Sequence, residues 1–408
     1  MTLHPPVPTD GPASITLRLN ACPSCGAPDM WVFFETRAVP VHSVLLMETS
    51  KQALAYPRGD IALGFCRSCG FIANLAFKPE MHEYSSKYEE TQGFSSTFNA
   101  FHRTLAQRLV DRYGLRGKEI IEIGCGKGEF LTLLCEIGNN RGVGFDPAYV
   151  PERNTSQAKD RVKFITDFYS EKYTNHQADF VCCKMTLEHI QNTREFVSMV
   201  RRSIGERHDT IVFFQIPDVT RVLRDIGFWD IYYEHCSYFS PGSLGRLFRA
   251  SGFDVMALGT EYDGQYLMVE ARPSRGTPTP PLPEENDLDA IEKDVAFFTE
   301  HIGPTLARWR QVLGDIRRQG KKAVIWGGGS KGVAFLTTLK VTEEIPYAVD
   351  INPFKHGTFM AGTGQEIVGP EFLRGYKPQV VIVMNPIYCA EIQKELDRMG
   401  LNAQLIPV

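Results

Sequence analysis

The sequence predicts an α/β protein made of a small metal-stapled module followed by two Rossmann-like folds. Strand-like apolar runs alternate with helical patterns in the middle of the chain and again near its carboxyl end. Two CxxC pairs lie close together before the first alternating region. Five prolines between Pro273 and Pro283 separate the two alternating regions, and no helix or central strand tolerates such a run.

The length and composition set the number of domains and the kind of partner. A chain of 408 residues exceeds what a single core supports, so we expect domains at residues 1–85, 86–272 and 284–408. A net charge of -4 argues against a surface that tracks nucleic acid. No basic and apolar leader and no apolar run of about 18 residues is present, which predicts a cytoplasmic protein without a membrane partner.

The middle region should form a parallel sheet with helices on both faces. Its strand-like runs are KEIIEIG, GVGFD, VKFIT, ADFVCCK and DTIVFFQI. Two later runs, DVMALGTEY and QYLMVEARP, are separated only by Asp263 and Gly264. An Asp-Gly turn indicates a hairpin, so we expect this sheet to end in an antiparallel strand.

The carboxyl-terminal region begins with a long helical pattern, which we expect to be broken or kinked near Gly303 and Pro304. The runs KKAVIWGGGSKGVAFLTTL, YAVDINP and PQVVIVMNP then predict a second, smaller Rossmann-like fold. Its GGGSKG loop is compatible with NAD, with a purely structural turn, or with the diphosphate of a nucleotide substrate. We favour the diphosphate, with Lys331 as its countercharge.

The cysteines of the first region predict a zinc site. Ten cysteines in a chain without a signal peptide do not indicate a disulfide framework. Four of them stand in two similar knuckles, CPSCGA and CRSCGF: Cys22, Cys25, Cys66 and Cys69. Four thiolates close a tetrahedral site and leave no open position for substrate, so the predicted role of the metal is structural.

The segment IEIGCGKGEF predicts a small-molecule site. An apolar strand leads into a turn that contains Gly124, Gly126 and Gly128 and then into a helix, whose N-terminus offers unpaired N–H groups. Asp146 ends the next strand, where α/β proteins use an acidic side chain to hold ribose hydroxyls. A glycine turn of some other dinucleotide fold is the alternative.

The candidate catalytic residues follow strand ends. The densest polar and aromatic cluster is DIYYEHCSYFS, which contains Tyr232, Glu234 and His235. It follows FFQIPD and should therefore lie at the ligand-binding edge of the sheet, together with His189 of MTLEHIQN. A histidine at such a place can exchange a proton near neutral pH, although a lone histidine is more often structural. Tyr84 and Tyr88, in EYSSKYEE, are candidates for a lid.

The glycine segment resembles the first motif of class I S-adenosylmethionine methyltransferases, and the predicted hairpin favours that fold over a dehydrogenase. The resemblance places the following residues at the methyl donor: Glu122, Gly124, Gly126, Gly128 and Asp146. It also places Asp167 near the adenine and Lys184 with Met185 beside the reactive end. We include Cys125, which lies between two of these glycines, in the predicted cofactor site.

The order of motifs along nearly the whole chain resembles the zinc-containing sugar C-methyltransferases. The resemblance rests on the two cysteine knuckles and on the segments IEIGCGKGEF, YYEHCSYF, GGGSKG and AVDINPFKHG. The resemblance implies that the first domain binds zinc, that the second binds S-adenosylmethionine, and that a nucleotide-linked keto sugar lies between the second and third. It implies His235 as the base, assisted by Tyr232 and Glu234, with His189 and Tyr88 lining the sugar.

Three segments depart from that family on the substrate side: AGTGQEI at 361–367, MNPIYCAEI near the end, and RAVPVHSVLL with His42. Methylation of oxygen or nitrogen on a sugar or another metabolite is therefore an alternative to C-methylation. The knuckles are also compatible with a nucleic-acid or protein-binding module attached to a methyltransferase. The acidic charge balance opposes that alternative, so we expect a small-molecule substrate and no nucleic acid.

Overall fold

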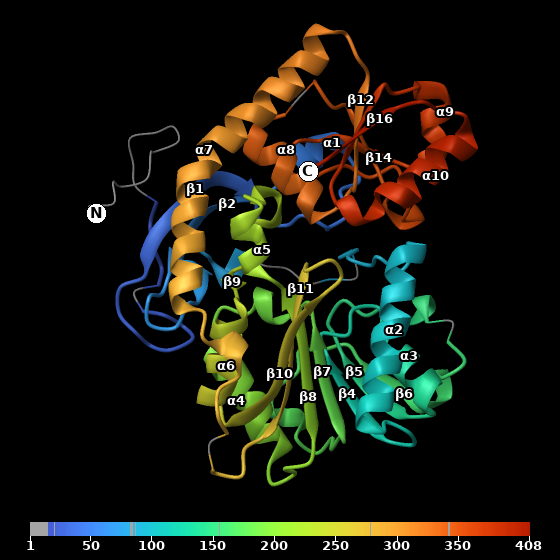
Figure 1. The fold of residues 1–408 in the computed structure, drawn as a ribbon. Helices are drawn as coiled ribbons and strands as arrows, with labels where there is room; N and C mark the ends of the chain where they lie inside the picture. Colours follow the sequence, from blue (N-terminus) through green and yellow to red (C-terminus); the bar gives the residue numbers. More distant parts are fainter. Residues whose placement is uncertain are drawn as a thin grey trace.

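The computed structural model describes residues 15–19, 21–81, 85, 87–154, 156–277, 279–341 and 343–408. Within them the chain forms three sheets of four, seven and five strands. The seven-stranded sheet occupies the lower half of Figure 1, and the five-stranded sheet lies above it. This arrangement confirms the predicted α/β class with two Rossmann-like folds.

The seven-stranded sheet has the order β10-β11-β8-β7-β4-β5-β6. Its strands are β4 (Glu119–Ile123), β5 (Arg141–Phe145), β6 (Val162–Ile165), β7 (Phe180–Lys184), β8 (Ile211–Pro217), β10 (Phe253–Glu261) and β11 (Tyr266–Pro273). Strands β4 to β8 pair in parallel, whereas β11 is antiparallel to both β8 and β10. The predicted hairpin is confirmed, and Asp263 and Gly264 in its turn have φ values of 57° and 70°.

Helices cover both faces of this sheet. They are α2 (Ser96–Tyr113), α3 (Glu129–Gly138), α4 (Thr193–Ile204), α5 (Val219–Arg224) and α6 (Pro241–Ala250). Because strand side chains alternate between faces, Phe213 packs in a core with α2 and α3, while Val212 and Phe214 pack with α4 and α6. The sheet is therefore buried on both faces and presents only its ends to ligands.

The amino-terminal sheet includes a strand from the middle of the chain. Its strands are β1 (Trp31–Pro40), β2 (Arg58–Phe65), β3 (Ile72–Asn74) and β9 (Ser237–Tyr238), with the short helix α1 (Ser50–Leu54) between β1 and β2. Strand β9 directly follows His235 in sequence and pairs with β3. The first module thus holds the segment that carries the candidate catalytic histidine.

Helix α7 (Leu288–Arg318) is continuous through Pro304. Of the expected break or kink near Gly303 and Pro304, the break is therefore wrong. Its first half buries Phe298 in the core of the four-stranded sheet, and its second half buries Trp309 in the core of the carboxyl-terminal domain. Pro304 lies on an exposed position between these two anchored halves. Packing on both sides offsets the hydrogen bond that a proline removes from a helix.

The carboxyl-terminal sheet is wholly parallel, in the order β14-β13-β12-β15-β16. Its strands are β12 (Ala323–Trp326), β13 (Tyr347–Val349), β14 (Glu366–Val368), β15 (Val380–Val383) and β16 (Gln404–Pro407). Its helices are α8 (Ser330–Leu339), α9 (Leu373–Tyr376) and α10 (Cys389–Met399). The smaller second Rossmann-like fold is therefore confirmed.

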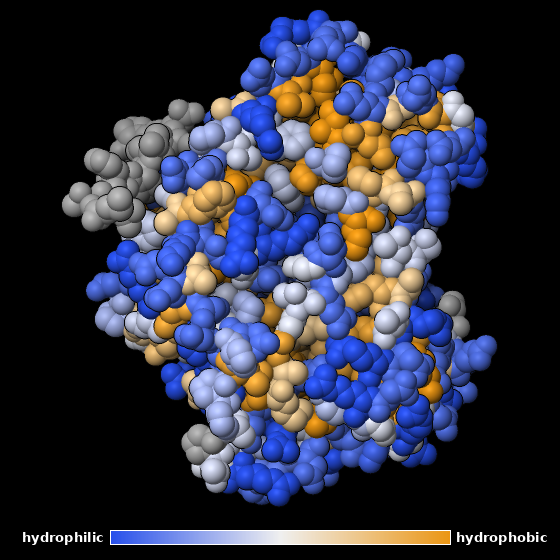
Figure 2. Space-filling view, in the orientation of Figure 1, coloured by the Kyte–Doolittle hydropathy of each residue, from blue (hydrophilic) through white to orange (hydrophobic). Residues whose placement is uncertain are grey.

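The molecular surface is mixed in character. Hydrophilic residues cover most of the face drawn in Figure 2, and hydrophobic residues reach the surface mainly over the carboxyl-terminal domain. Such a mixture is ordinary for a folded protein. Among the described residues, no helix combines the length and the apolar character needed to span a membrane.

Candidate functional site

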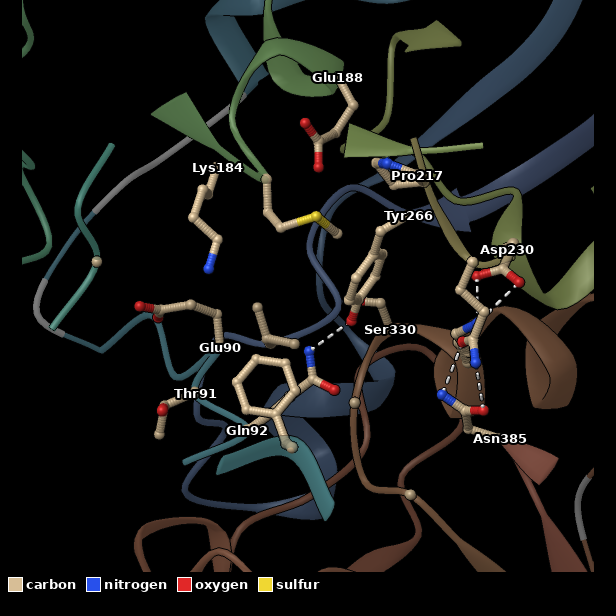
Figure 3. A pocket seen from close by; sticks show the side chains of 18 of the residues that line it. Glu90, Thr91, Gln92, Lys184, Glu188, Pro217, Asp230, Tyr266, Ser330 and Asn385 are labelled. Carbon is tan, nitrogen blue, oxygen red and sulfur yellow. Dashed lines mark hydrogen bonds and ion pairs between the residues drawn. The ribbon is translucent and has the colours of Figure 1, made fainter. Parts of the chain in front are cut away.

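A cavity of about 1180 Å³ lies between the seven-stranded sheet and the carboxyl-terminal domain. Its lining comes from the carboxyl ends of β4, β5, β7 and β8, from the loops before α2, and from the GGGSKG loop. In Figure 3, Lys184 and Glu188 enter from one side, Glu90 and Gln92 from another, and Asn385 from the carboxyl-terminal domain. The cavity lies where α/β sheets bind ligands.

The glycine turn after β4 forms an open backbone cradle at this cavity. Gly124, Gly126 and Gly128 have φ values of 69°, 53° and 81°, in the left-handed region that favours glycine. A Cβ atom at Gly124 would lie 2.0 Å from the hydroxyl oxygen of Thr186, and one at Gly126 would lie 2.7 Å from Glu90 Oε1. Thr186 and Glu90 therefore leave no room for a side chain at Gly124 and Gly126, and only glycine fits at these two positions.

Asp146, at the end of β5, joins two loops of the cradle. Its Oδ2 accepts a hydrogen bond from the backbone N–H of Gly126 at 2.8 Å, and its Oδ1 accepts one from Ala148 at 2.7 Å. Burial raises the pKa of its carboxyl group. The Lys127 ammonium supports the same loops by donating to the carbonyl oxygens of Tyr88 and Ala148, each at 2.8 Å.

Glu122 and Lys184 lie together beneath the cradle. Burial raises the pKa of Glu122 to about 8, an effect that the nearby Lys184 partly offsets, and its Oε2 has no hydrogen-bond partner among the described residues. Burial disfavours the charged form of Lys184 as well, which lowers the pKa of this group to about 8. The Lys184 ammonium lies 2.8 Å from His102 Nε2 and 3.7 Å from the centre of the Phe130 ring.

The two remaining predicted donor residues also line the cavity. Cys125 is buried, which raises the pKa of its thiol. Asp167 follows β6 and accepts hydrogen bonds from the Phe168 N–H at 2.8 Å and the Tyr173 hydroxyl at 2.5 Å. Its ion pair with Lys172 keeps the pKa of this carboxyl below its usual value.

The structure brings the candidate catalytic histidines together. The rings of His189 and His235 meet edge to face with centroids 4.9 Å apart. The Tyr232 hydroxyl lies 2.8 Å from His235 Nε2. The ring nitrogens of these histidines and a carboxylate oxygen of Glu188 all lie within 4.8 Å of one another. Tyr88 lines the same cavity, whereas Tyr84 lies outside the described residues.

Glu234 does not line the cavity with its neighbours. It is buried against the amino-terminal segment, where its carboxylate accepts from the Ser43 hydroxyl and lies 3.1 Å from His42 Nδ1. The Ser43 hydroxyl oxygen also lies 2.7 Å from the Ser330 hydroxyl oxygen, within hydrogen-bonding distance. The structure therefore gives Glu234 a place in a network that joins all three parts of the chain.

The cavity lining includes ionisable residues that were absent from the predicted site, among them Glu188, Glu90 and His102. Glu188 directly precedes His189 after a predicted strand, and Glu90 ends the segment EYSSKYEE that was predicted as a lid, so both had a signal in the sequence. His102 had no such signal, because it comes from a segment without a motif. Enclosure in the cavity wall raises the pKa of Glu90 to about 7, although about a third of its side chain is accessible (31%).

Ion pairs and hydrogen bonds within the chain link the carboxyl-terminal wall of the cavity to the middle region. The Lys331 ammonium lies 2.8 and 2.9 Å from the two carboxylate oxygens of Asp230, so this cation already has a counterion. Asp350 accepts from the Gly328 N–H at 3.0 Å. Gln265 and Asn385 exchange two side-chain hydrogen bonds of 3.1 and 2.8 Å, which tie the β10–β11 turn to the carboxyl-terminal domain.

The four predicted zinc ligands converge outside the cavity. Their sulfur atoms all lie within 4.8 Å of one another, and the Cys22–Cys69 and Cys25–Cys66 pairs are each 3.6 Å apart. In each knuckle a glycine N–H donates to the carbonyl oxygen of the first cysteine at 2.8 Å. A zinc tetrahedron with bonds of about 2.3 Å has sulfur–sulfur edges of about 3.8 Å, so the cluster fits such an ion.

Comparison with known proteins identifies two families of domain in the chain. Residues 98–258 match a methyltransferase domain, and residues 283–406 match a C-methyltransferase C-terminal domain. The C-methyltransferase NovU of Streptomyces niveus is 27% identical over 345 residues, which cover 80% of each chain. A ubiquinone biosynthesis O-methyltransferase of Escherichia coli O7:K1 is 26% identical over 146 residues, which cover 33% of this chain and 60% of that protein.

Solved methyltransferase structures are similar to part of the chain. One is the 1,6-didemethyltoxoflavin N1-methyltransferase of Burkholderia thailandensis with bound S-adenosylhomocysteine, at 16% identity and a TM-score of 0.33. That match covers 42% of this chain and 78% of the other. Another is the magnesium protoporphyrin IX methyltransferase of Synechocystis PCC 6803, at 16% identity and a TM-score of 0.35, covering 44% and 84%.

Proposed function

We propose that this S-adenosylmethionine-dependent methyltransferase, which is similar to C-methyltransferases over most of its length, methylates a carbon next to the keto group of a nucleotide-linked 4-keto sugar. One observation carries the proposal above all: a histidine pair stands at the carboxyl edge of the sheet, between the glycine cradle and the carboxyl-terminal domain. Such a cavity has room for a methyl donor and a sugar nucleotide side by side.

The cradle suits S-adenosylmethionine, which supplies an electrophilic methyl group on a cationic sulfur. Gly124 and Gly126 line the cavity without side chains of their own, so a donor can approach the backbone there, and Asp146 is positioned to accept from its ribose hydroxyls. We assign Asp167 to the adenine end and the Glu122–Lys184 region to the amino-acid end. Buried carboxyl groups with raised pKa values favour a ligand that brings positive charge.

His235 is the proposed base. A keto group acidifies the proton on the neighbouring carbon, and His235 removes that proton. The hydrogen bond between the Tyr232 hydroxyl and His235 Nε2 orients the imidazole ring. The resulting carbanion takes the methyl group in line. His189 and Tyr88 line the sugar. Glu234 has an indirect role: its contacts with His42 and Ser43 fix the backbone next to His235.

The metal proposed at the four cysteines is a structural zinc ion. Its ligands lie outside the cavity and leave no coordination position for a substrate. The ion would hold the module that pairs with β9 behind His235.

A second candidate function is methylation of a hydroxyl or amine. The similarity of one third of the chain to an O-methyltransferase favours it, and His235 could deprotonate a hydroxyl as readily as a carbon. The two reactions differ in one respect: only C-methylation requires a carbon-bound proton that exchanges with solvent.

The test uses His235→Asn and a keto-sugar nucleotide in D₂O. We expect wild-type protein to incorporate deuterium at the methylated carbon without any methyl donor, and the variant to do so about 10² to 10⁴ times more slowly. The loss should appear mainly in kcat. His208→Asn, which changes a histidine that does not line the cavity, is the matched control and should behave as wild type.

Two results would contradict the proposal in different ways. Full exchange in His235→Asn would move the base to His189 or Tyr88. Productive methylation without exchange in either protein would favour transfer to oxygen or nitrogen instead.

A further inference from the structure

Glu188 is a buried carboxyl group that the mechanism above leaves without a role. It lies in a short 3-10 helix, Leu187–His189, immediately after β7. The residue is 2% exposed, and neither of its carboxylate oxygens has a hydrogen-bond partner among the described residues. Figure 3 shows its carboxyl group pointing into the cavity. A buried polar group in this condition requires an explanation.

The surroundings of Glu188 favour the protonated form. The titratable groups that interact with it most closely are Cys183, Tyr232, His235, Cys236 and His189, none of which is a permanent cation. Among the described residues no lysine or arginine forms an ion pair with it. Burial raises the pKa of Glu188 to about 8, and only a hydrogen bond from its own backbone opposes that rise.

Its position relative to His235 is fixed by the backbone. The N–H of Cys236 donates to the carbonyl oxygen of Glu188 at 2.9 Å, which joins the two segments that carry the acid and the base. A carboxylate oxygen of Glu188 lies within 4.8 Å of a ring nitrogen of His235. This spacing suits a substrate whose acidic C–H and carbonyl oxygen belong to adjacent carbon atoms.

We propose that Glu188 is a second catalytic group, a neutral carboxylic acid that donates a hydrogen bond to the keto oxygen of the substrate while His235 takes the proton from the adjacent carbon. The inference rests on the proposed C-methylation. It assigns Glu188 to the developing oxyanion, where a neutral acid in an apolar setting is an effective donor.

The electrons and protons balance without a further reactant. The C–H electron pair forms the carbon–carbon double bond of the enol, and the proton goes to His235. The carbonyl π electrons move onto the oxygen, which shares the proton of Glu188. The carbon–carbon double bond of the enol then supplies the electron pair for the new bond to the methyl group, and the methyl–sulfur bond of S-adenosylmethionine breaks with its electrons left on sulfur, which gives S-adenosylhomocysteine. The carbonyl re-forms, Glu188 keeps its proton, and His235 releases its own to solvent.

Two variants distinguish a neutral Glu188 that donates a hydrogen bond from an ionised Glu188 that cannot. Glu188→Gln keeps a neutral hydrogen-bond donor of similar size, so we expect deuterium exchange within about tenfold of wild type. Glu188→Leu removes the donor and should lower exchange by about 10² to 10³-fold. Wild-type exchange should fall above about pH 8, as Glu188 loses its proton, and this fall should vanish in Glu188→Gln. Calorimetric binding of the methyl donor confirms that each variant is folded.

Infrared spectroscopy supplies a readout that needs no substrate. The wild-type minus Glu188→Gln difference spectrum at pH 7 should contain the carbonyl band of a protonated carboxyl group. A carboxylate band in its place, or a Gln variant as slow as the Leu variant, overturns the inference. Wild-type protein could instead bind a divalent ion in addition to the zinc proposed at the four cysteines. If Glu188→Gln loses that additional ion, then Glu188, His189 and His235 form a cation site and the inference is overturned.

The failure of the proposed function is distinguishable from the failure of this inference. Methyl transfer without carbon exchange in wild-type protein overturns C-methylation and with it the keto-oxygen role of Glu188. The infrared band still reports whether Glu188 carries a proton. Exchange in wild type together with a carboxylate band overturns only the inference.

Discussion

Asp146 can fix the loops of the cradle and bind a ligand at the same time, because each of its carboxylate oxygens has two lone pairs. One lone pair of each oxygen accepts from the backbone of Gly126 or Ala148, which fixes the cradle. The others remain for the hydroxyl groups of a ligand in the cavity. Substitution of Asp146 should therefore affect the ribose end of the donor and not its reactive sulfur.

We expect Asp146→Asn to weaken the binding of S-adenosylmethionine and of S-adenosylhomocysteine by the same amount, about 1 to 3 kcal/mol, because the ribose is common to both. Isothermal calorimetry measures the two affinities. Asp167→Asn, at the more exposed end of the cavity, is the comparison and should cost less. Unchanged affinity in Asp146→Asn would place the ribose elsewhere.

At the residue scale, local patterns predicted the cradle, and contacts between distant segments escaped prediction. Glycine spacing and a strand-ending aspartate are visible in a short stretch of sequence, and Gly124, Gly126 and Asp146 do line the cavity. The Glu234–His42 contact joins residues 192 positions apart, which no local pattern reveals. Lys331 was predicted to be the countercharge of a diphosphate. In the structure it forms an ion pair with Asp230, a contact that depends on tertiary packing and that no local pattern reveals.

At the scale of elements, the cysteine cluster and β9 belong to one structural unit. Cys66 and Cys69 lie in the turn between β2 and β3, and β3 pairs with β9 beside the segment that carries His235. Phe71 of the same turn packs against Phe239 with ring centroids 5.0 Å apart. Loss of the cluster should therefore loosen the support of His235 without touching the donor cradle.

We expect purified protein to contain about one zinc ion per chain by elemental analysis, as four thiolates require. Cys66→Ser should lose the ion, lower the stability of the amino-terminal sheet in hydrogen exchange, and leave donor affinity within about twofold of wild type. Cys389→Ser changes a cysteine of another domain and serves as the control. Folded wild-type protein without zinc would contradict the assignment.

Helix α7 shows why element boundaries were harder to predict than element types. The sequence predicted a long helix that is broken or kinked near Gly303 and Pro304, because proline in a helix interior breaks or kinks it. The energy that keeps the helix continuous comes from Phe298 and Trp309, which pack against two different sheets. Such tertiary support is invisible in the local pattern, whereas the Asp-Gly hairpin depends on local turn chemistry and was predicted correctly.

At the scale of the whole molecule, the cavity collects buried carboxyl groups whose ionisation the fold opposes. Burial raises the pKa of Glu90 to about 7 and the pKa values of Glu122 and Glu188 to about 8. In an unfolded chain these groups titrate near pH 4.3. Between those values the native state holds more protons than the unfolded state, so the native state loses stability as the pH rises.

The buried histidines and Lys184 affect stability mainly outside the range from pH 6.5 to 8. Burial lowers the pKa of His102 to about 2 and of His189 to about 4, which makes stability rise with pH, but only below about 6.5, where unfolded histidine titrates. Lys184, with its pKa lowered to about 8, has the same sign of effect only above pH 8. The carboxyl groups therefore dominate between pH 6.5 and 8.

We expect the melting temperature of the ligand-free protein to fall by a few degrees between pH 6.5 and 8, a change that differential scanning fluorimetry resolves. S-adenosylmethionine should reduce this fall, because its positive charge favours the ionised carboxyl groups, whereas S-adenosylhomocysteine, without the sulfonium charge, should reduce it less. Glu122→Gln should flatten the dependence in the ligand-free protein, and Glu371→Gln, an exposed carboxyl on another domain, should leave it intact. A melting temperature that rises over this range would mean that the cavity carboxyl groups are already ionised in the native state, and the preference for a cationic ligand would lose its basis.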